Sequence, residues 1–217
     1  MKLLVMVVAV TMALALGGVA QAQTTTTEDS KGYVEGVAQS AFGNVTSQSF
    51  GAEAGVSLGH GLYVFVDAGY VRDTAPSVLG VNAQIIAGFL SQSATSVTFQ
   101  VYQPVAFGIA GLKYVVPVTG RIEPYVLGGV GAARIRKDVT FTVAGADVTS
   151  TLAQYGVVLG SDLAGTETKV MFSVGGGVMW PAWRRVVADF QYRFGRVSTS
   201  GPALNISRAG IGIGVRF

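Results

Sequence analysis

The stretch RAGIGIGVRF at positions 208–217 decides the fold of this chain. From Ala209 onward every second residue is apolar, and the positions between them hold only Gly and Arg. Side chains of a β-strand point alternately to opposite faces, so the stretch predicts a strand with one apolar face and one small, cationic face. The apolar face of such a strand is stable against lipid when the strand belongs to a membrane-spanning barrel.

Seven more segments complete a set of eight predicted strands. Four of them repeat the same alternation: Phe50–Gly59, Leu62–Val71, Lys169–Trp180 and Arg185–Phe194. Three follow it less strictly: Tyr33–Phe42, Pro104–Val116 and Ile122–Ile135. Their lengths are close to the ~9–11 residues that a tilted transmembrane strand needs.

Two of these segments are apolar on both faces, which weakens the prediction of their orientation. For residues 104–116 the pattern assigns neither face to the interior. For residues 122–135, the charged residues Arg121 and Glu123 both occupy odd positions. Because charged side chains avoid lipid, the odd positions of this segment are predicted to face inward.

The connections between the predicted strands alternate in length. Short connections at 59–61, 117–120 and 181–184 alternate with longer ones at 43–48, 73–96, 136–167 and 197–205. Outer-membrane barrels have short periplasmic turns, long outer loops and an even number of strands. The sequence therefore predicts an all-β protein, an eight-stranded antiparallel up-and-down transmembrane β-barrel.

The two longest connections are predicted to carry short helices. Apolar residues in 76–90 and in 148–159 recur at spacings that fit an amphipathic helix. A hairpin that extends the barrel wall above the membrane is the alternative for both segments.

The N-terminal residues have the pattern of a secretory signal peptide. Lys2 precedes an apolar run over 3–16, and the small-x-small sequence Ala20-Gln21-Ala22 follows it. The apolar run is short for a membrane anchor, and no basic stop-transfer segment follows it. The predicted organisation is a signal peptide over 1–22 with cleavage after Ala22, an N-terminal extension over 23–30 and a barrel domain over 31–217.

Composition is consistent with an exported membrane barrel. Half of the residues are hydrophobic, 12 % are charged and 30 are Gly, whereas a soluble domain has about 25 % charged residues. The absence of Cys excludes disulfides and Cys-ligated metal sites. A formal net charge of +3 on scattered residues is too weak to indicate nucleic-acid binding.

The alternation also predicts what lies inside the barrel. The lipid-facing orientation places charges of both signs among glycines in the lumen, and buried charges must be paired. The hypothesis is that four acids pair with four bases there: Glu35, Glu53, Asp67 and Asp189 with Lys169, Arg185, Arg193 and Arg208. Trp180 and Trp183 flank a short turn, where an interfacial aromatic girdle is expected.

The chain resembles the small outer-membrane β-barrel proteins of Gram-negative bacteria, of the OmpA transmembrane-domain and OmpX type. The resemblance covers nearly all of residues 31–217 and rests on four short stretches: Ala20-Gln21-Ala22, GLKY at 111–114, EPYVLGGVG at 123–131 and GIGVRF at 212–217. It implies that Gly212, Val215 and Phe217 form the C-terminal signal read by the barrel-assembly machinery. It also implies location in the cell outer membrane, with outer-membrane lipid as the surroundings.

Two groups of residues are candidate sites. Arg134, Arg136 and Lys137 cluster at the predicted outer end of the fifth strand and are candidates for contact with lipopolysaccharide phosphates, the alternative being a solvated rim. His60, the only histidine, lies between two glycines and is predicted to be a turn residue. As a general base or metal ligand it would need partners that the sequence does not offer.

The function predicted from these observations is that of a non-enzymatic, monomeric outer-membrane barrel without a cofactor. It would be structural, or would bind a surface partner through loops 73–96 and 136–167. A small-solute pore is the first alternative, although side chains fill the interior of eight-stranded barrels. A lipid-modifying enzyme and a soluble exported binding barrel are less consistent with the sequence.

Overall fold

The computed structural model describes residues 30–92, 94, 96–160, 163–199 and 202–217. The predicted signal peptide and its cleavage site lie outside the described residues, as does most of the 23–30 extension. Within the described ranges, no helix has the length and apolar character needed to cross a bilayer.

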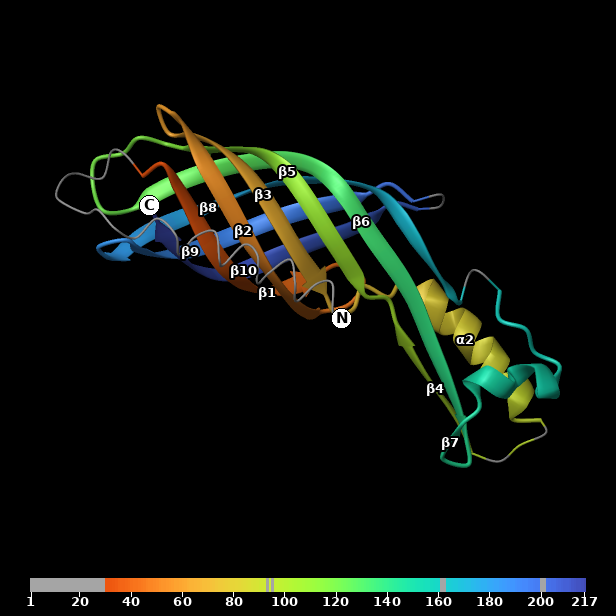
Figure 1. Ribbon diagram of the computed structural model, residues 1–217. Coiled ribbons are helices and arrows are strands. Elements are labelled where there is room, and N and C mark those ends of the chain that lie inside the picture. The colour runs from red at the N-terminus through yellow and green to blue at the C-terminus, as the bar shows by residue number, and fades with distance from the viewer. Residues whose placement is uncertain (1–29, 93, 95, 161–162, 200–201) are drawn as a thin grey trace.

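Eight strands close into a ring, which confirms the predicted fold class (Figure 1). The ring consists of β1 (Gly32–Phe42), β2 (Ser47–Gly59), β3 (Leu62–Val71), β5 (Val105–Val115), β6 (Glu123–Val143), β8 (Gly165–Trp183), β9 (Val186–Val197) and β10 (Leu204–Arg216). Neighbours in this order pair antiparallel, and β1 closes the ring by pairing with β10 from Tyr33↔Arg216 to Phe42↔Ser207. Closure leaves the ring without free sheet edges.

The barrel has two different ends. At the turn end, on the left of Figure 1, the short connections after β2, β5 and β8 lie together with the C-terminus. His60 has a φ of 54° in the first of these turns, and its position confirms the prediction of a turn residue. At the opposite, loop end, the chain makes its longer connections.

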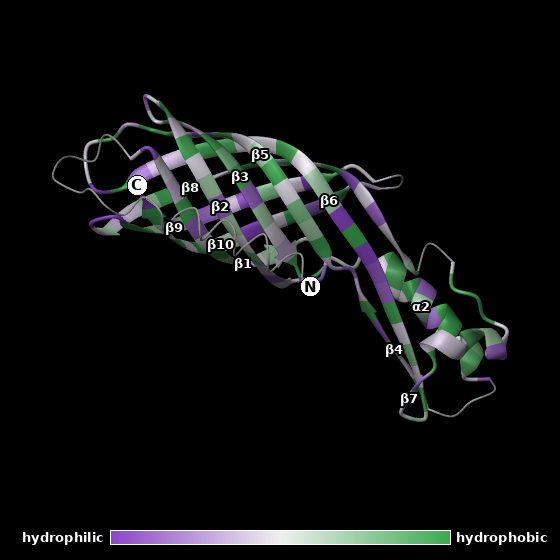
Figure 2. Ribbon diagram, in the orientation of Figure 1, coloured by the Kyte–Doolittle hydropathy of each residue, from purple (hydrophilic) through white to green (hydrophobic). Residues whose placement is uncertain are grey.

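Hydrophobic and hydrophilic residues alternate along the barrel strands (Figure 2), and exposed and buried residues alternate in β9 and β10, as the sequence predicts. In β10, Ile211, Ile213 and Val215 are 51 %, 66 % and 49 % exposed, whereas Arg208 is 2 % exposed. The outside of the ring is therefore apolar and the charged side chains lie inside it, the reverse of a water-soluble barrel.

The ring also settles the orientation of the two segments that the sequence left ambiguous. Pairing with β3 turns the odd positions of β5 inward, so Phe107 and Lys113 are buried. The odd positions of β6 face inward as predicted, and Tyr125 and Leu127 are buried. Glycines make room for these rings, since a Cβ at Gly177 would lie 2.7 Å from the Tyr125 hydroxyl oxygen.

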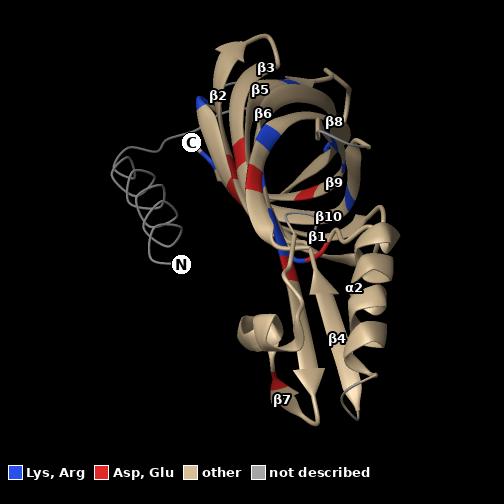
Figure 3. Ribbon diagram, turned by 90° about the vertical axis from the view of Figure 1, so that its right-hand side faces the viewer, with Lys and Arg blue, Asp and Glu red and all other residues tan. Residues whose placement is uncertain are grey.

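Beyond the loop end, part of the chain forms a second layered unit, here called the outer extension. The 21-residue strand β6 continues past the ring and pairs with β4 (Val97–Tyr102), from Val97↔Val143 to Tyr102↔Asp138. The two-residue strand β7 (Ala146–Asp147) also pairs with β6. The helix α2 (Ser77–Leu90) and the 3-10 helix η1 (Thr149–Tyr155) complete the unit (Figure 3).

The outer extension has an apolar core of its own. Phe141 of β6 is fully buried, and Val139 is 4 % exposed. The buried face of α2 covers them with Leu79, Ala83 and Leu90, and Leu152 of η1 belongs to the same cluster. A separate core of this kind holds the extension as an ordered unit rather than as flexible loops.

The predictions for the long connections are partly confirmed. The helix predicted over 76–90 is α2, but the second one is only the short η1. The alternative of an extended wall is also realised, because β4 and the outer half of β6 form it. The alternating sequence VTFQVY at 97–102 could have indicated β4. It lies outside the eight predicted transmembrane strands, within a connection that was predicted to carry a helix.

Placing a charge on the outer face of the ring should destabilise it in a depth-dependent way. We expect Ile211→Arg to lower the free energy of unfolding by about 2–4 kcal/mol, because the guanidinium enters hydrocarbon. Asn205→Arg, in the same outward row but at the loop end, should cost no more than about 1 kcal/mol. Urea unfolding in phospholipid vesicles would measure both, and equal losses would contradict this orientation.

Candidate functional site

Three carboxylates lie side by side on one wall of the lumen. Glu35 of β1 is the direct cross-strand partner of Glu53 of β2, which is the partner of Asp67 of β3. All three are 3 % exposed or less. Like charges directly opposite one another destabilise a sheet, so this wall requires counter-charges from elsewhere.

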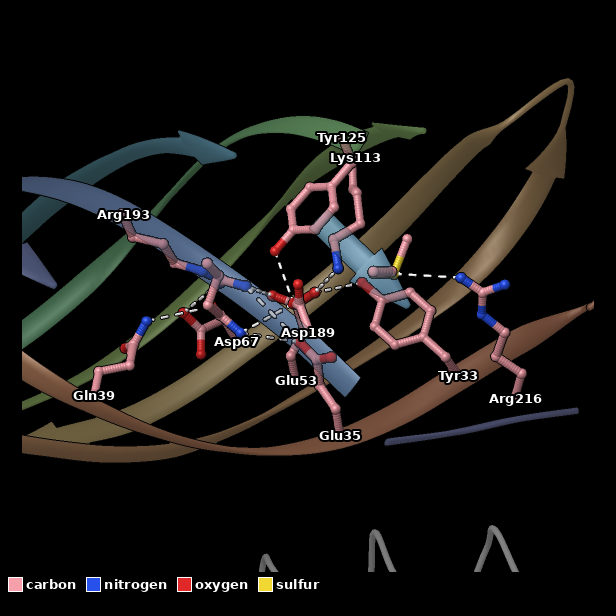
Figure 4. Close-up of polar contacts among 12 residues, drawn as sticks. Tyr33, Glu35, Gln39, Glu53, Asp67, Lys113, Tyr125, Asp189, Arg193 and Arg216 are labelled. Carbon is pink, nitrogen blue, oxygen red and sulfur yellow. Dashed lines mark hydrogen bonds and ion pairs between the residues drawn. The ribbon is translucent and has the colours of Figure 1, made fainter. Parts of the chain in front are cut away.

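The next two strands of the ring, β10 and β9, supply these counter-charges. Arg193 of β9 and Arg208 of β10 are themselves cross-strand partners. The Arg193 side chain points across the lumen at the acids (Figure 4). Arg193 forms ion pairs with Glu53 and, at 2.9 Å, with Asp67, and Arg208 lies 3.4 Å from Asp67. The like charges within each group repel one another, and the ion pairs across the lumen offset the repulsion in both groups.

Lys113 of β5 completes this luminal ion network. Its Nζ lies 2.6 Å from Glu53 and 4.3 Å from the ring centroids of both Tyr33 and Tyr125. The Tyr33 hydroxyl donates a hydrogen bond to Glu53, and the Tyr125 hydroxyl donates one of 2.7 Å to Asp189. The ammonium group is thus held by one carboxylate and two aromatic faces.

The structure confirms part of the predicted pairing and corrects the rest. No base among the described residues forms an ion pair with Asp189; the side-chain amide of Gln191 and the Tyr125 hydroxyl donate hydrogen bonds to it. Arg185 is exposed in the turn after β8, and Lys169 lies 3.5 Å from Glu167 near the loop end. The prediction is wrong for these two bases: both lie near strand ends, outside the observed network in the middle of the barrel.

The sequence prediction missed Lys113 as a member of the network. Lys113 lies in residues 104–116, a segment for which the sequence pattern assigned neither face to the interior. A lone Lys in the middle of an otherwise apolar predicted strand was the available signal.

An apolar layer fills the lumen between the ion network and the loop end. Its side chains are 6 % exposed or less: Ala41, Val71, Val105, Phe107, Ile135, Met171, Val197, Leu204 and Ile206. The Arg208 guanidinium lies 4.1 Å from the Phe107 ring centroid, which joins this layer to the network. The lumen is therefore a packed core with a polar and an apolar layer, not only the set of charges and glycines that was predicted.

One part of the outer extension carries no charged residues. Residues 74–104, which include α2 and β4, contain no Asp, Glu, Lys or Arg (Figure 3). On α2 one row of apolar side chains is covered by β4 and β6, and a second row is at least 51 % exposed: Val78, Val81, Ile85 and Phe89. Exposed apolar rows of this kind are unusual on a solvated helix.

The other face of the extension is polar. Thr98 and Gln100 of β4 are exposed opposite Thr142 and Thr140 of β6. Because β6 is one continuous strand, this face continues the outward face of the barrel. At the far tip, the Thr149 side chain and its backbone N–H, 2.9 Å from the carboxylate, hold the pKa of Asp147 below its usual range.

The three predicted lipopolysaccharide contacts do not share a face. Arg134 and Arg136 are exposed in the outward row of β6, just beyond the apolar part of that row, and Arg136 pairs with Asp138 at 2.7 Å. Lys137 is half-buried and lies in the inward row of the same strand. A strand has period two, so neighbours in sequence are separated here.

The residues of the implied assembly signal lie at the turn end of β10. Gly212 is buried inside the ring, and Val215 and Phe217 are 49 % and 52 % exposed. Their recognition by an assembly factor remains a prediction. The described residues contain no cluster of three or more side chains suited to a metal ion.

The chain matches no protein-family model and no curated protein. Its fold is similar to the crystal structure of the N-terminal β-barrel domain of Pseudomonas aeruginosa OprF, with a TM-score of 0.52 and 15 % identity, over 88 % of this chain and 99 % of that one. It is also similar to a major outer membrane protein from Thermus thermophilus, with a TM-score of 0.51 and 10 % identity, over 86 % and 99 % of the two chains. At these identities the likeness shows the fold, that of a small outer-membrane β-barrel.

Removal of the Arg193 guanidinium should destabilise the barrel more than a change at an outward-facing arginine. We expect Arg193→Met to lower the free energy of unfolding by about 3–5 kcal/mol, because it leaves three buried carboxylates with only Lys113 and Arg208 as counter-charges. Arg196→Met, an outward-facing change on the same strand, should stay within about 0.5 kcal/mol. Denaturant titration followed by the electrophoretic mobility of folded protein would compare them, and similar losses would contradict the role of the network.

The two cores should respond separately to mutation. Phe141→Ala removes a fully buried ring from the core of the extension, a change that costs about 3–5 kcal/mol in a packed core. We expect proteolysis within residues 75–103 and 137–164 while the barrel stays folded, because the barrel has its own core. Thr140→Ala, one residue away on the polar face, is the control and should leave proteolysis unchanged.

Proposed function

We propose that this chain is a non-enzymatic integral protein of the outer membrane that holds an ordered surface platform outside the bilayer. The observation that carries the proposal is the reversed barrel: the outside of the ring is apolar and the charges are buried within it. Lipid is the surrounding in which both faces are stable. The outer extension, with its separate core, is then held clear of the membrane on a rigid base.

The packed lumen favours a structural or binding role over transport. The ion network and the apolar layer occupy the cross-section of the barrel with side chains that are almost fully buried. A pore would require these contacts to break. An enzymatic role has little support from the chain's only histidine, which lies in a turn between two glycines.

Lipopolysaccharide is the proposed lipid partner of the loop-end rim. Arg134 and Arg136 are exposed where the outward row of β6 changes from apolar to polar, the level at which lipid phosphates lie. Guanidinium groups bind phosphate through charge-assisted hydrogen bonds. The polar face of β4 and β6 continues from these arginines and offers hydroxyl and amide groups to sugars.

The topology and the closed lumen can be tested together. Protease added to intact cells should cut within residues 75–103 or 137–164 only after the extension is loosened by Phe141→Ala, and should leave a protected barrel. The purified protein in a planar bilayer should show no conductance above leak. Steady conductance would favour the pore, and recovery of the protein in the soluble fraction would overturn the membrane assignment.

The lipopolysaccharide contact predicts a selective effect of two arginines. We expect the double variant Arg134→Gln/Arg136→Gln to retain several-fold less lipopolysaccharide on purification in mild detergent, because two phosphate contacts are lost. Lys137→Gln is the control from the inward row and should retain the amount bound by the unmodified chain. If all three proteins retain equal amounts of lipopolysaccharide, the proposed contact with Arg134 and Arg136 is wrong.

A further inference from the structure

The turn end of the barrel carries an exposed cationic arc. The side chains of Lys31, Arg184 and Arg185 are exposed there, and no acidic side chain pairs with them among the described residues. The one described side-chain carboxylate at this rim, Glu123, is already paired with two guanidinium nitrogens of Arg216. Among the side chains that the structure describes, the arc therefore has an excess of positive charge at one edge of the apolar belt.

Backbone hydrogen bonds make this arc continuous across three strands. The N–H of Arg216 donates to the carbonyl of Arg185 at 2.9 Å, which joins β10 to the turn before β9. The N–H of Gly32 donates to the carbonyl of Phe217 at 2.9 Å, which joins β10 to β1 just after Lys31. Arg184, Arg185 and Lys31 thus lie along one stretch of rim rather than at scattered positions.

Apolar and aromatic side chains border the same stretch. Trp183, immediately before Arg184, is 72 % exposed, and Trp180 on the same strand is 47 % exposed. Phe217 is 52 % exposed between Arg185 and Lys31. Rings at a membrane boundary lie at the level of the lipid headgroups, so the cations beside them lie at the level of the lipid phosphates.

We propose that this arc, together with Trp183 and Phe217 at its border, binds the headgroups of anionic phospholipids in the leaflet at the turn end. Arg184 and Arg185 bind phosphate, and Trp183 and Phe217 rest against the acyl chains below it. A soluble polyanion would leave the exposed rings without a partner. A zwitterionic lipid would leave the excess positive charge of the arc uncompensated, which favours the anionic lipid.

The two tryptophans of the chain, Trp180 and Trp183, both border the arc and serve as built-in reporters. The full chain is folded into phosphatidylcholine vesicles that contain brominated phosphatidylglycerol or, in parallel, brominated phosphatidylcholine. Bromine quenches only nearby indoles, so the two quenching curves give the relative association of the two lipids with the arc. We expect phosphatidylglycerol to associate about 3- to 10-fold more strongly, and less so at high salt.

Matched variants separate the arc from the rest of the surface. In Arg184→Gln/Arg185→Gln the preference should fall to about 1 to 2. Arg72→Gln/Arg196→Gln, which removes two exposed arginines at the opposite end of the barrel, should keep the preference of the unmodified chain. Equal quenching by both lipids in the unmodified chain would overturn the inference, and so would a preference that survives loss of Arg184 and Arg185.

The inference rests on the proposed membrane location, and the same measurement tells the two apart. If no brominated lipid quenches the tryptophans, the rim does not lie in a bilayer, and the proposed function fails. If both lipids quench equally, the membrane location stands and only the lipid preference fails. The unmodified chain alone gives this answer, so the test does not depend on folding of the variants.

Discussion

The interaction on which the rest of the structure depends is the pairing of two like-charged walls across the lumen. Glu35, Glu53 and Asp67 repel one another along β1, β2 and β3, and Arg193 and Arg208 do so along β9 and β10. Neither wall is stable alone in a low-dielectric interior, where an uncompensated buried charge costs several kcal/mol, on the order of 3–5. The ring must therefore close at the diameter that lets each wall reach the other.

Closure at that diameter has consequences on both sides of the sheet. Because the side-chain period of a strand is two, the register that brings Arg193 to Asp67 also turns the apolar row of each strand outward. A shift of the strand register by one residue would expose the ion network to lipid and place the outward-facing apolar side chains in the lumen. One strand register thus fixes both the luminal contacts and the lipid-facing surface. The apolar layer closes the lumen between the network and the loop end.

The continuous strand β6 transfers this pattern to the outer extension. Its inward row, which packs the barrel lumen through Tyr125, Leu127 and Ile135, goes on to form the core of the extension through Val139 and Phe141. Its outward row changes from Val126 and Val130 to arginine and threonine where the membrane is proposed to end. The two rims of the barrel then differ: the loop end is rich in hydroxyl groups, and the turn end combines cations with exposed rings.

The sequence by itself determined the strand alternation, the eight-strand ring with unequal connections, the helix α2 and most members of the ion network. These depend on local periodicity, which each segment carries alone. Tertiary structure decided the orientation of β5, and with it the place of Lys113, because a segment that is apolar on both faces is oriented only by the strands that pair with it. It also separated Lys137 from Arg136 and joined β4 to the far end of β6. Such contacts arise when a closed sheet brings distant residues into register, and no single stretch of chain contains that information.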